Sequence, residues 1–329
     1  MRSFAFCSDS GLASKLATSL RYARAGLVLT LLLAGFRPAL ALDGDTPSNG
    51  QPLKMFNSLD EALRDGLDRL KAGDPKSSVR ALTYAADGGQ PLAQWQLGRM
   101  YASGEGVPKD DIKAFHYYEA LVEAYDEDDP NRANSSAVSN AFIAVGLYCL
   151  TGIPGSDVKP DSLRAREMFQ YAAMNFRDRE AQYRLARLYM DGAPGLEKNN
   201  RVAAHWLALA AEKRHLPAQA YLGHLLFQGD GVPRQRARGL MWLMIARNGA
   251  APGDAWIRDL YAKDMALAEN DDREMARIYV EERTHPVAMA RNGGPFGLID
   301  ALSPFSRLFS SAPMSAFETN EQPPESGQK

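Results

Sequence analysis

The sequence predicts an all-α protein, a right-handed α-solenoid in which helix pairs stack one on another. Three observations predict it: four segments share one spacing of small residues and glycines, helices ending in small residues precede them, and apolar residues recur at intervals of three and four. Such a period indicates a repeat architecture, because each helix pair covers its apolar face with the next pair.

The first 41 residues have the pattern of a secretory signal peptide. Basic residues precede the apolar run Ala25 to Phe36, and Ala39-Leu40-Ala41 follows Pro38 as an A-x-A cleavage site. The alternative is a membrane anchor, but the run has twelve residues, and crossing a bilayer takes about 20. We therefore expect cleavage after Ala41, a periplasmic protein with no membrane insertion after cleavage, and a linker over 42–57.

The charge balance excludes a typical nucleic-acid binder. The whole chain has a formal net charge of −2, and the leader holds five basic residues and one acidic residue. Its removal leaves 33 basic against 39 acidic residues, a net charge of −6, whereas nucleic-acid binders gather an excess of Lys and Arg. The mature chain keeps one cysteine, Cys149, so its stability must come from packing and not from a disulfide.

Each repeat has a small residue, which we call the anchor, and a glycine six positions after it. The anchors are separated by 48, 40 and 37 residues, which fits one helix pair per unit with insertions of differing length. Alanine or glycine at a helix crossing lets two backbones approach closely, and a glycine after the helix suits a C′ position with positive φ. The four pairs are Gly98 with Gly104, Gly146 with Gly152, Ala186 with Gly192, and Gly223 with Gly229.

The solenoid is expected to run from 58 to 283, with about four to five helix pairs. Ser58 and Glu61 form a capping box that begins the first helix. At the other end, 284–310 contains a short apolar piece, Phe296 to Phe309, which we expect to cap the last repeat because an end repeat leaves an apolar face. The polar segment 311–329 is expected to be a disordered tail.

Two inserted loops are the candidate partner contacts. Asp126, Glu127, Asp128 and Asp129 interrupt the second unit, and Ser156 and Asp157 lie in the segment Thr151 to Pro160. A calcium loop is the alternative for the acidic run, but the order D-x-[DN]-x-[DN]-G with a glutamate at the twelfth position is missing. A hydrated acidic loop that meets a partner is the better interpretation.

The sequence contains no recognisable catalytic, cofactor or metal motif, and we expect none of the three. The glycine loops Gly104-Glu-Gly106 and Gly229-Asp-Gly231 lack a third glycine and follow no strand, which disfavours a nucleotide site. The five histidines form no H-x-x-x-H pair. No G-x-S-x-G elbow and no nucleophilic cysteine with a paired base is present. These absences favour a binding protein over an enzyme.

The repeat resembles the Sel-like repeat, a longer relative of the tetratricopeptide repeat. Gly104-Glu-Gly-Val-Pro108 and Gly229-Asp-Gly-Val-Pro233 are similar to that family's inter-repeat loop, and the third unit departs from it with Gly192-Ala-Pro-Gly195. The resemblance covers about residues 59 to 262 and implies the helix-pair solenoid.

The middle of the chain, Leu147 to Ser156 with Leu163 to Ala173, also resembles the ExoR family of exopolysaccharide regulators. That resemblance implies a periplasmic repeat protein that binds the sensor domain of a two-component histidine kinase and restrains its signalling. The alternative is a generic periplasmic scaffold for envelope or cell-wall proteins.

Overall fold

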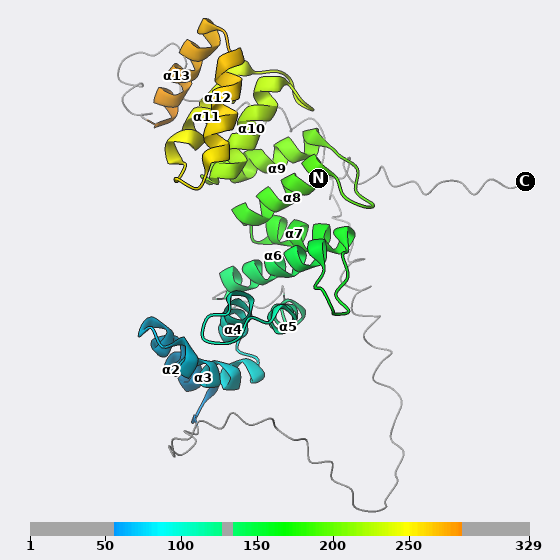
Figure 1. Cartoon of the computed structure of the whole chain (residues 1–329), viewed down its shortest axis with the longest axis vertical. Helices are drawn as coiled ribbons and strands as arrows, with labels where there is room; N and C mark the ends of the chain where they lie inside the picture. Colours follow the sequence, from blue (N-terminus) through cyan, green and yellow to red (C-terminus); the bar gives the residue numbers. More distant parts are fainter. Residues whose placement is uncertain (1–55, 127–133, 285–329) are drawn as a thin grey trace, which may run out of the picture. The chain divides into compact units, whose positions relative to one another are not determined.

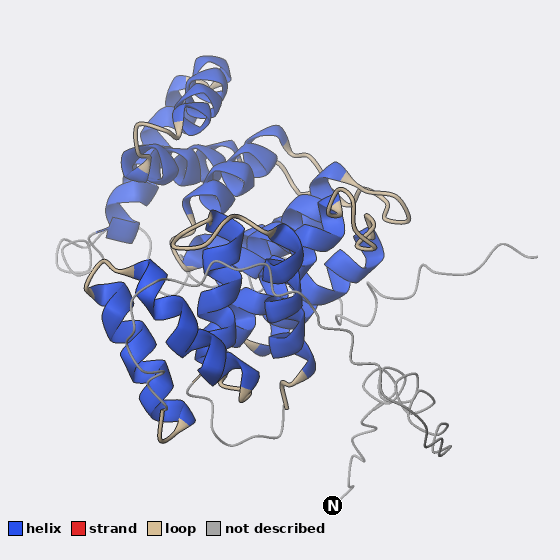
Figure 2. Ribbon diagram, turned by 60° about the horizontal axis from the view of Figure 1, so that its bottom comes forward, coloured by secondary structure: helices blue, strands red, loops and turns tan. Residues whose placement is uncertain are grey.

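The computed structural model describes residues 56–126 and 134–284, and within these ranges it contains twelve helices and no strand beyond one isolated bridge, between Ala193 and Leu196. Figure 2 shows this part of the chain as helices joined by loops. The helices are α2 Leu59–Lys71, α3 Pro75–Asp87, α4 Pro91–Ser103, α5 Asp111–Glu123, α6 Ser135–Thr151, α7 Ser162–Asn175, α8 Arg179–Asp191, α9 Asn200–Glu212, α10 Leu216–Gln228, α11 Arg236–Gly249, α12 Ala255–Leu267 and α13 Asn270–Thr284.

From α2 to α12, each helix packs on the next one in the chain, as Figure 1 shows for the stack. The most extensive contacts join α2 to α3, α4 to α5, α6 to α7, α8 to α9, and α10 to α11. We refer to α4, α6, α8 and α10 as the first helices and to α5, α7, α9 and α11 as the second helices. The predicted all-α solenoid is confirmed. Within the described ranges no helix is long and apolar enough to cross a bilayer.

The small anchor residues lie where the first and second helices cross. A Cβ atom on Gly223 would lie 2.7 Å from the carbonyl oxygen of Gly239, and one on Gly146 would lie 2.6 Å from the Phe169 ring. Both distances are shorter than a real Cβ contact, so these helices approach to a separation that a larger side chain would prevent. The close crossing expected from the sequence is confirmed at these two positions.

The glycines six positions later end the first helices, also as expected. Gly104 and Gly229 are C-caps in the left-handed region, with φ of 79° and 77°. Gly152 and Gly192 also have positive φ, 66° and 72°. L-residues rarely adopt these values, so glycine is the residue that fits.

A buried glutamine joins three of the first helices to the helix before them. It lies four residues before the anchor. Its side-chain amide donates to a carbonyl near the end of the preceding helix. The bonds run from Nε2 of Gln94 to the carbonyl of Ala86 at 3.5 Å, from Gln182 to Ala173 at 3.4 Å, and from Gln219 to Ala211 at 3.0 Å.

The second repeat has a phenylalanine, Phe142, at the glutamine position. Its ring stacks on Tyr171 with 4.5 Å between centroids, and Phe176 and Tyr125 lie 6.1 and 6.3 Å away. We call Tyr125, Phe142, Tyr171 and Phe176 the aromatic joint. It therefore connects the end of α5, the middle of α6 and the end of α7 by apolar packing.

The two ends of the described solenoid are closed differently. At the start, Ser58 caps α2 by accepting from the Glu61 N–H at 3.1 Å, and the Glu61 carboxylate accepts from the N–H of Asn57 at 2.9 Å. At the other end, α13 turns back and packs on α11, where the Arg283 guanidinium lies 4.3 Å from the centre of the Trp242 ring. The cap expected over 284–310 lies, apart from Thr284, outside the described residues, as do the leader, almost all of the linker and the tail.

Candidate interaction site

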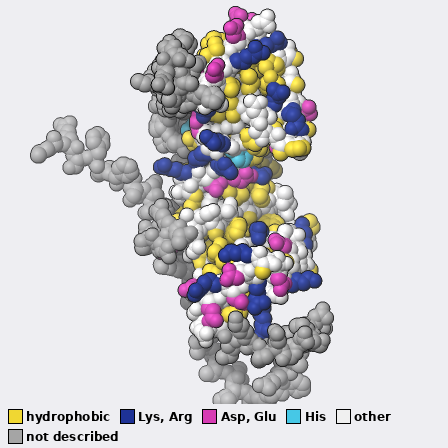
Figure 3. Space-filling model, turned by 90° about the vertical axis from the view of Figure 1, so that its left-hand side faces the viewer, with side chains coloured by type: hydrophobic (Ala, Val, Ile, Leu, Met, Phe, Trp, Pro, Cys, Tyr) yellow, Lys and Arg dark blue, Asp and Glu magenta, His cyan; other side chains and the backbone are white. Residues whose placement is uncertain are grey.

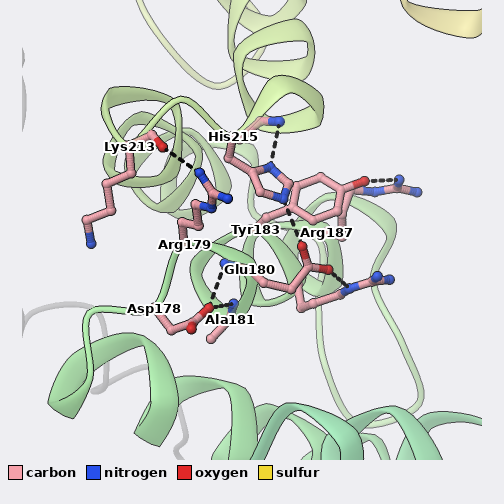
Figure 4. Close-up of polar contacts among 10 residues, drawn as sticks. Asp178, Arg179, Glu180, Ala181, Tyr183, Arg187, Lys213 and His215 are labelled. Carbon is pink, nitrogen blue, oxygen red and sulfur yellow. Dashed lines mark hydrogen bonds and ion pairs between the residues drawn. The ribbon is translucent and has the colours of Figure 1, made fainter. Parts of the chain in front are cut away.

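His215 links the third repeat to the fourth. It is the N-cap of α10, where its Nδ1 accepts from the N–H of Ala218 at 3.2 Å. Because Nδ1 accepts, the ring proton lies on Nε2, which donates to Glu180 Oε2 at 2.8 Å. Arg184 Nε donates to the other oxygen of Glu180 at 2.6 Å. Figure 4 shows this network, which joins the N-terminal ends of α8 and α10.

The same network sets the charge of Glu180. The hydrogen bond from His215 is the main cause that holds the pKa of this carboxyl below its ordinary value, and Arg184 adds to the effect, while burial opposes it. The carboxylate is therefore ionised at neutral pH and remains a hydrogen-bond acceptor for both partners.

A surface of aromatic and arginine side chains lies beside this joint. Arg187 Nη1 donates to the hydroxyl of Tyr221 at 3.0 Å and to that of Tyr183 at 3.3 Å, and Nη2 pairs with Asp191 at 2.7 Å. Tyr221 stacks on Trp256 with 5.0 Å between ring centroids. We call Tyr183, Arg187, Asp191, Tyr221 and Trp256 the Arg187 surface; its residues come from α8, α10 and α12, and Tyr183 among them is buried.

The Arg187 surface has the composition of a protein-binding site. The Arg187 side chain is 33% exposed, while its guanidinium is fixed by two hydroxyls and lies 4.7 Å from the centre of the Tyr221 ring. Arginine, tyrosine and tryptophan supply most of the binding energy at protein interfaces, and fixed side chains lose little entropy on binding. This arrangement can therefore hold a partner's apolar or acidic side chains without rearrangement.

The candidate contacts expected from the sequence lie on two separate segments of the chain. Asp126 is exposed just after α5, and Glu127, Asp128 and Asp129 lie outside the described residues. Ser156 and Asp157 follow the other end of α6, a helix of 17 residues, which is about 25 Å long. The helix α6 therefore separates the two groups along the chain.

Ser156 has a local role in its loop. Its hydroxyl donates to the carbonyl of Ile153 at 2.9 Å and accepts from the N–H of Val158 at 3.1 Å, and Lys159 Nζ donates to the carbonyl of Ser156 at 2.6 Å. Asp157 is exposed beside it. Of these two residues, Asp157 is the one whose side chain is available to a partner.

The Arg187 surface was missed by the sequence analysis. The repeat pattern did not single out Arg187 or the aromatic residues around it. A usable signal was present, because Tyr183 and Arg187 are four residues apart and share one helix face, and Tyr221 lies one repeat later, one position beyond the equivalent of Tyr183. Cys149, the cysteine that the mature chain is expected to keep, is buried, and burial raises the pKa of its thiol.

The chain was compared with known families and structures. The Sel1 repeat model matches residues 91–125, 140–175, 179–215 and 216–246, so each family repeat begins at a first helix. A crystal structure of a Sel1 repeat protein from Oxalobacter formigenes is similar to this chain with 26% identity and a TM-score of 0.51, and the match covers 72% of this chain and 89% of that chain.

Two curated relatives match over most of their length. Both are called exopolysaccharide production negative regulator. The protein from Rhizobium meliloti (strain 1021) is 33% identical over 81% of this chain and 95% of its own length. The protein from Rhizobium leguminosarum bv. viciae is 30% identical over 76% of this chain and 89% of its own length. With its Sel1 repeats and this near-complete match, the chain belongs to the family of exopolysaccharide production negative regulators.

Proposed function

We propose that this protein is an exported negative regulator of exopolysaccharide production that binds the sensor domain of a membrane histidine kinase. The observation that carries the proposal is the match to two negative regulators along almost their entire length. Binding favours the kinase's off state if the complex with that state is the tighter one, because a ligand shifts an equilibrium only by its difference in affinity for the two states.

The Arg187 surface supports a protein partner. It presents a fixed arginine between two tyrosines, with Trp256 stacked beside them, on helices of two consecutive repeats and on α12. A stack of repeats offers such a surface as one continuous strip, which suits an extended or convex partner. We assign the sensor-domain contact to this surface, with Asp157 and the acidic run from Asp126 to Asp129 as further contacts.

Export is part of the proposal. The basic stretch, the apolar run and the A-x-A site before Leu42 support secretion and cleavage after Ala41, which would place the repeats on the same side of the membrane as a sensor domain. The N-terminal sequence of the protein purified from a periplasmic fraction tests this step. A mature chain that begins at Leu42 is expected, and an uncleaved chain in the cytoplasm would contradict it.

Co-purification tests the partner. A tagged full-length protein is cross-linked in cells, and the captured proteins are identified by mass spectrometry, with exopolysaccharide measured in a deletion strain. We expect a membrane-spanning histidine kinase among the partners and raised exopolysaccharide in the deletion. If no histidine kinase is captured and the deletion leaves exopolysaccharide unchanged, the regulator proposal fails and the scaffold alternative remains.

Variants of the Arg187 surface locate the contact. Arg187→Ala and Trp256→Ala should each weaken binding to the purified sensor domain about 30-fold, the loss expected for an interface residue worth about 2 kcal/mol. Tyr84→Ala is the matched control, because Tyr84 is an aromatic residue on α3 that is 47% exposed. Equal binding by all three variants would place the contact elsewhere.

A further inference from the structure

Four basic residues gather at two adjacent turns between helices. Arg177 precedes α8 and Arg179 begins it, while Lys213 and Arg214 lie between α9 and α10. The turns are linked, because Arg179 Nη1 donates to the carbonyl of Lys213 at 3.1 Å and Lys213 Nζ donates to the carbonyl of Arg177. Figure 4 shows the first of these bonds, and Figure 3 shows Lys and Arg side chains grouped beside a histidine on one face. We call these four residues the basic edge.

The basic edge lacks counterions among the residues that the structure describes. Within the described residues, none of its four side chains forms an ion pair with a carboxylate. The nearby acids are otherwise engaged: Asp178 accepts from the N–H groups of Glu180 and Ala181, Glu180 pairs with His215 and Arg184, and Glu212 pairs with Arg283.

Lys213 shows the resulting electrostatic environment. Its ammonium group donates to the carbonyl of Arg177 and to the amide oxygen of Gln182, which are neutral acceptors. Burial lowers the pKa of Lys213, and the charge of Arg177 lowers it further, against the opposing effect of Asp178. An external anion at this position would relieve the repulsion between the two cations.

The backbone at Arg177 and Arg214 adds an independent observation. Both residues lie directly before the N-cap of a first helix and have positive φ, 52° and 60°, and no other non-glycine residue in the described part of the chain does. Gly89 occupies the equivalent position before α4, with φ of 83°. Glycine adopts this conformation freely, whereas an arginine there is strained. The two turns therefore carry a charged side chain where a glycine would fit better, which points to a use for that charge.

We propose that the basic edge binds a carboxylate-rich segment of a partner protein. The planar guanidinium group matches a carboxylate with two parallel hydrogen bonds, and three of the four residues are arginines. Asp178 and Glu180 lie between the basic residues along the chain. Such a surface of mixed sign is complementary to another protein surface, whereas phosphate-rich surfaces favour uninterrupted positive charge.

This inference rests on the proposed function, since both require a protein partner. Its test, however, uses a defined peptide probe and no kinase. The mature chain is titrated into a fluorescent glutamate-rich peptide and into the same peptide with glutamines, and anisotropy is recorded at two salt concentrations. We expect binding to the glutamate peptide alone, weakening as salt rises. Stronger binding to phosphatidylglycerol vesicles than to the glutamate peptide would overturn the proposal in favour of a lipid surface.

The sharpest variant is the double substitution Arg177→Gly and Arg214→Gly. It removes two charges and also the strained backbone, so the melting temperature should not fall while peptide affinity drops about tenfold or more. The double variant R80E/R277E is a control with a larger charge change, because Arg80 and Arg277 are exposed on α3 and α13, and its affinity should stay closer to that of the wild type.

Two outcomes contradict the assignment. Wild-type affinity in the glycine variant would exclude the basic edge, and a greater loss of affinity in R80E/R277E would show an effect of net charge alone. If the glutamate peptide binds as expected while no histidine kinase co-purifies with the protein and the deletion leaves exopolysaccharide unchanged, the basic edge stands and the proposed function fails.

Discussion

The second repeat and the other three join their helices by different chemistry. In the first, third and fourth repeats a buried glutamine amide donates to a carbonyl eight or nine residues earlier, near the end of the preceding helix. In the second repeat Phe142 takes that position and packs in the aromatic joint. A hydrogen bond is directional and fixes one geometry, whereas ring packing tolerates several.

The difference follows from the length of the connection before each first helix. The glutamine reaches a carbonyl because the preceding helix ends only a few residues earlier. In the second repeat α5 ends at Glu123 and α6 begins at Ser135, so the residues eight or nine positions before Phe142 belong to the insertion and not to α5. The acceptor at that spacing is therefore missing from α5, and an apolar ring that packs against Tyr125 fills the position instead.

The largest expected effect is the loss of the aromatic joint. Phe142→Ala removes a buried ring that touches three others and leaves a cavity between α6 and α7, so we expect the free energy of unfolding to fall by about 3 to 5 kcal/mol. Urea unfolding followed by circular dichroism measures it. Met174→Ala is the control, since that side chain on α7 is 47% exposed, and a comparable loss there would mean that the joint has no special weight.

A smaller effect is expected at the amide joints. Gln219→Leu keeps the size of the side chain but removes one of two donors to the carbonyl of Ala211, which still accepts from the N–H of Arg214 at 3.0 Å, so we expect a loss of about 0.5 to 1.5 kcal/mol. Gln94→Leu should cost less, because its bond is 3.5 Å long against 3.0 Å for Gln219. Equal losses, measured by thermal and urea unfolding, would show that the amide acts by packing and not by its hydrogen bond.

The smallest effect concerns the stability at acid pH of the hydrogen-bonded contact between His215 and Glu180, which the second repeat lacks. The pKa of Glu180 is below its ordinary value of 4.5, so the carboxylate stabilises the fold above that pH, and the contribution is lost as the pH falls through the lower folded-state pKa. Glu180→Gln should therefore reduce stability at neutral pH and flatten its fall below about pH 4.5.

The size of that effect is limited by exposure. The Glu180 side chain is 38% exposed, so we expect a change below about 1 kcal/mol between neutral and acid pH. Glu197→Gln, in the exposed loop after α8, is the control in the same urea titrations. An unchanged acid profile in Glu180→Gln would show that the hydrogen bond from His215 adds no net stability.

Much of the fold could be predicted from local pattern. The spacing of Gly98 to Gly104 and of Gly223 to Gly229 predicts a close crossing followed by a left-handed helix end, and the structure has both. Ser58 was recognisable as a cap because a cap depends on residues within one turn. The buried glutamine is recognisable in the sequence as Ala-Gln in three repeats. Its hydrogen bond was not predicted, because the acceptor carbonyl belongs to another helix.

The candidate site was predicted less well. Exposed loops were chosen because insertions and charge runs stand out in a sequence, and their binding role remains a prediction. The Arg187 surface depends on Tyr183, Tyr221 and Trp256, and the last two are 34 and 69 residues from Arg187. The pair of Tyr183 and Arg187 on one helix face was the signal within reach, whereas separations of 34 and 69 residues carry no pattern that distinguishes a surface contact from core packing.

The sequence by itself determined the helix pairs, their crossings and their ends, because these follow from a period of three to four residues and from the backbone freedom of glycine. Only the tertiary structure decided which side chains meet across repeats, such as His215 with Glu180, and which turns bring basic residues together. The physical reason is that the sequence of each repeat fixes which residues lie on each helix face. The rotation and loop length between repeats set which residues of the next repeat that face contacts, and both depend on packing along the whole stack.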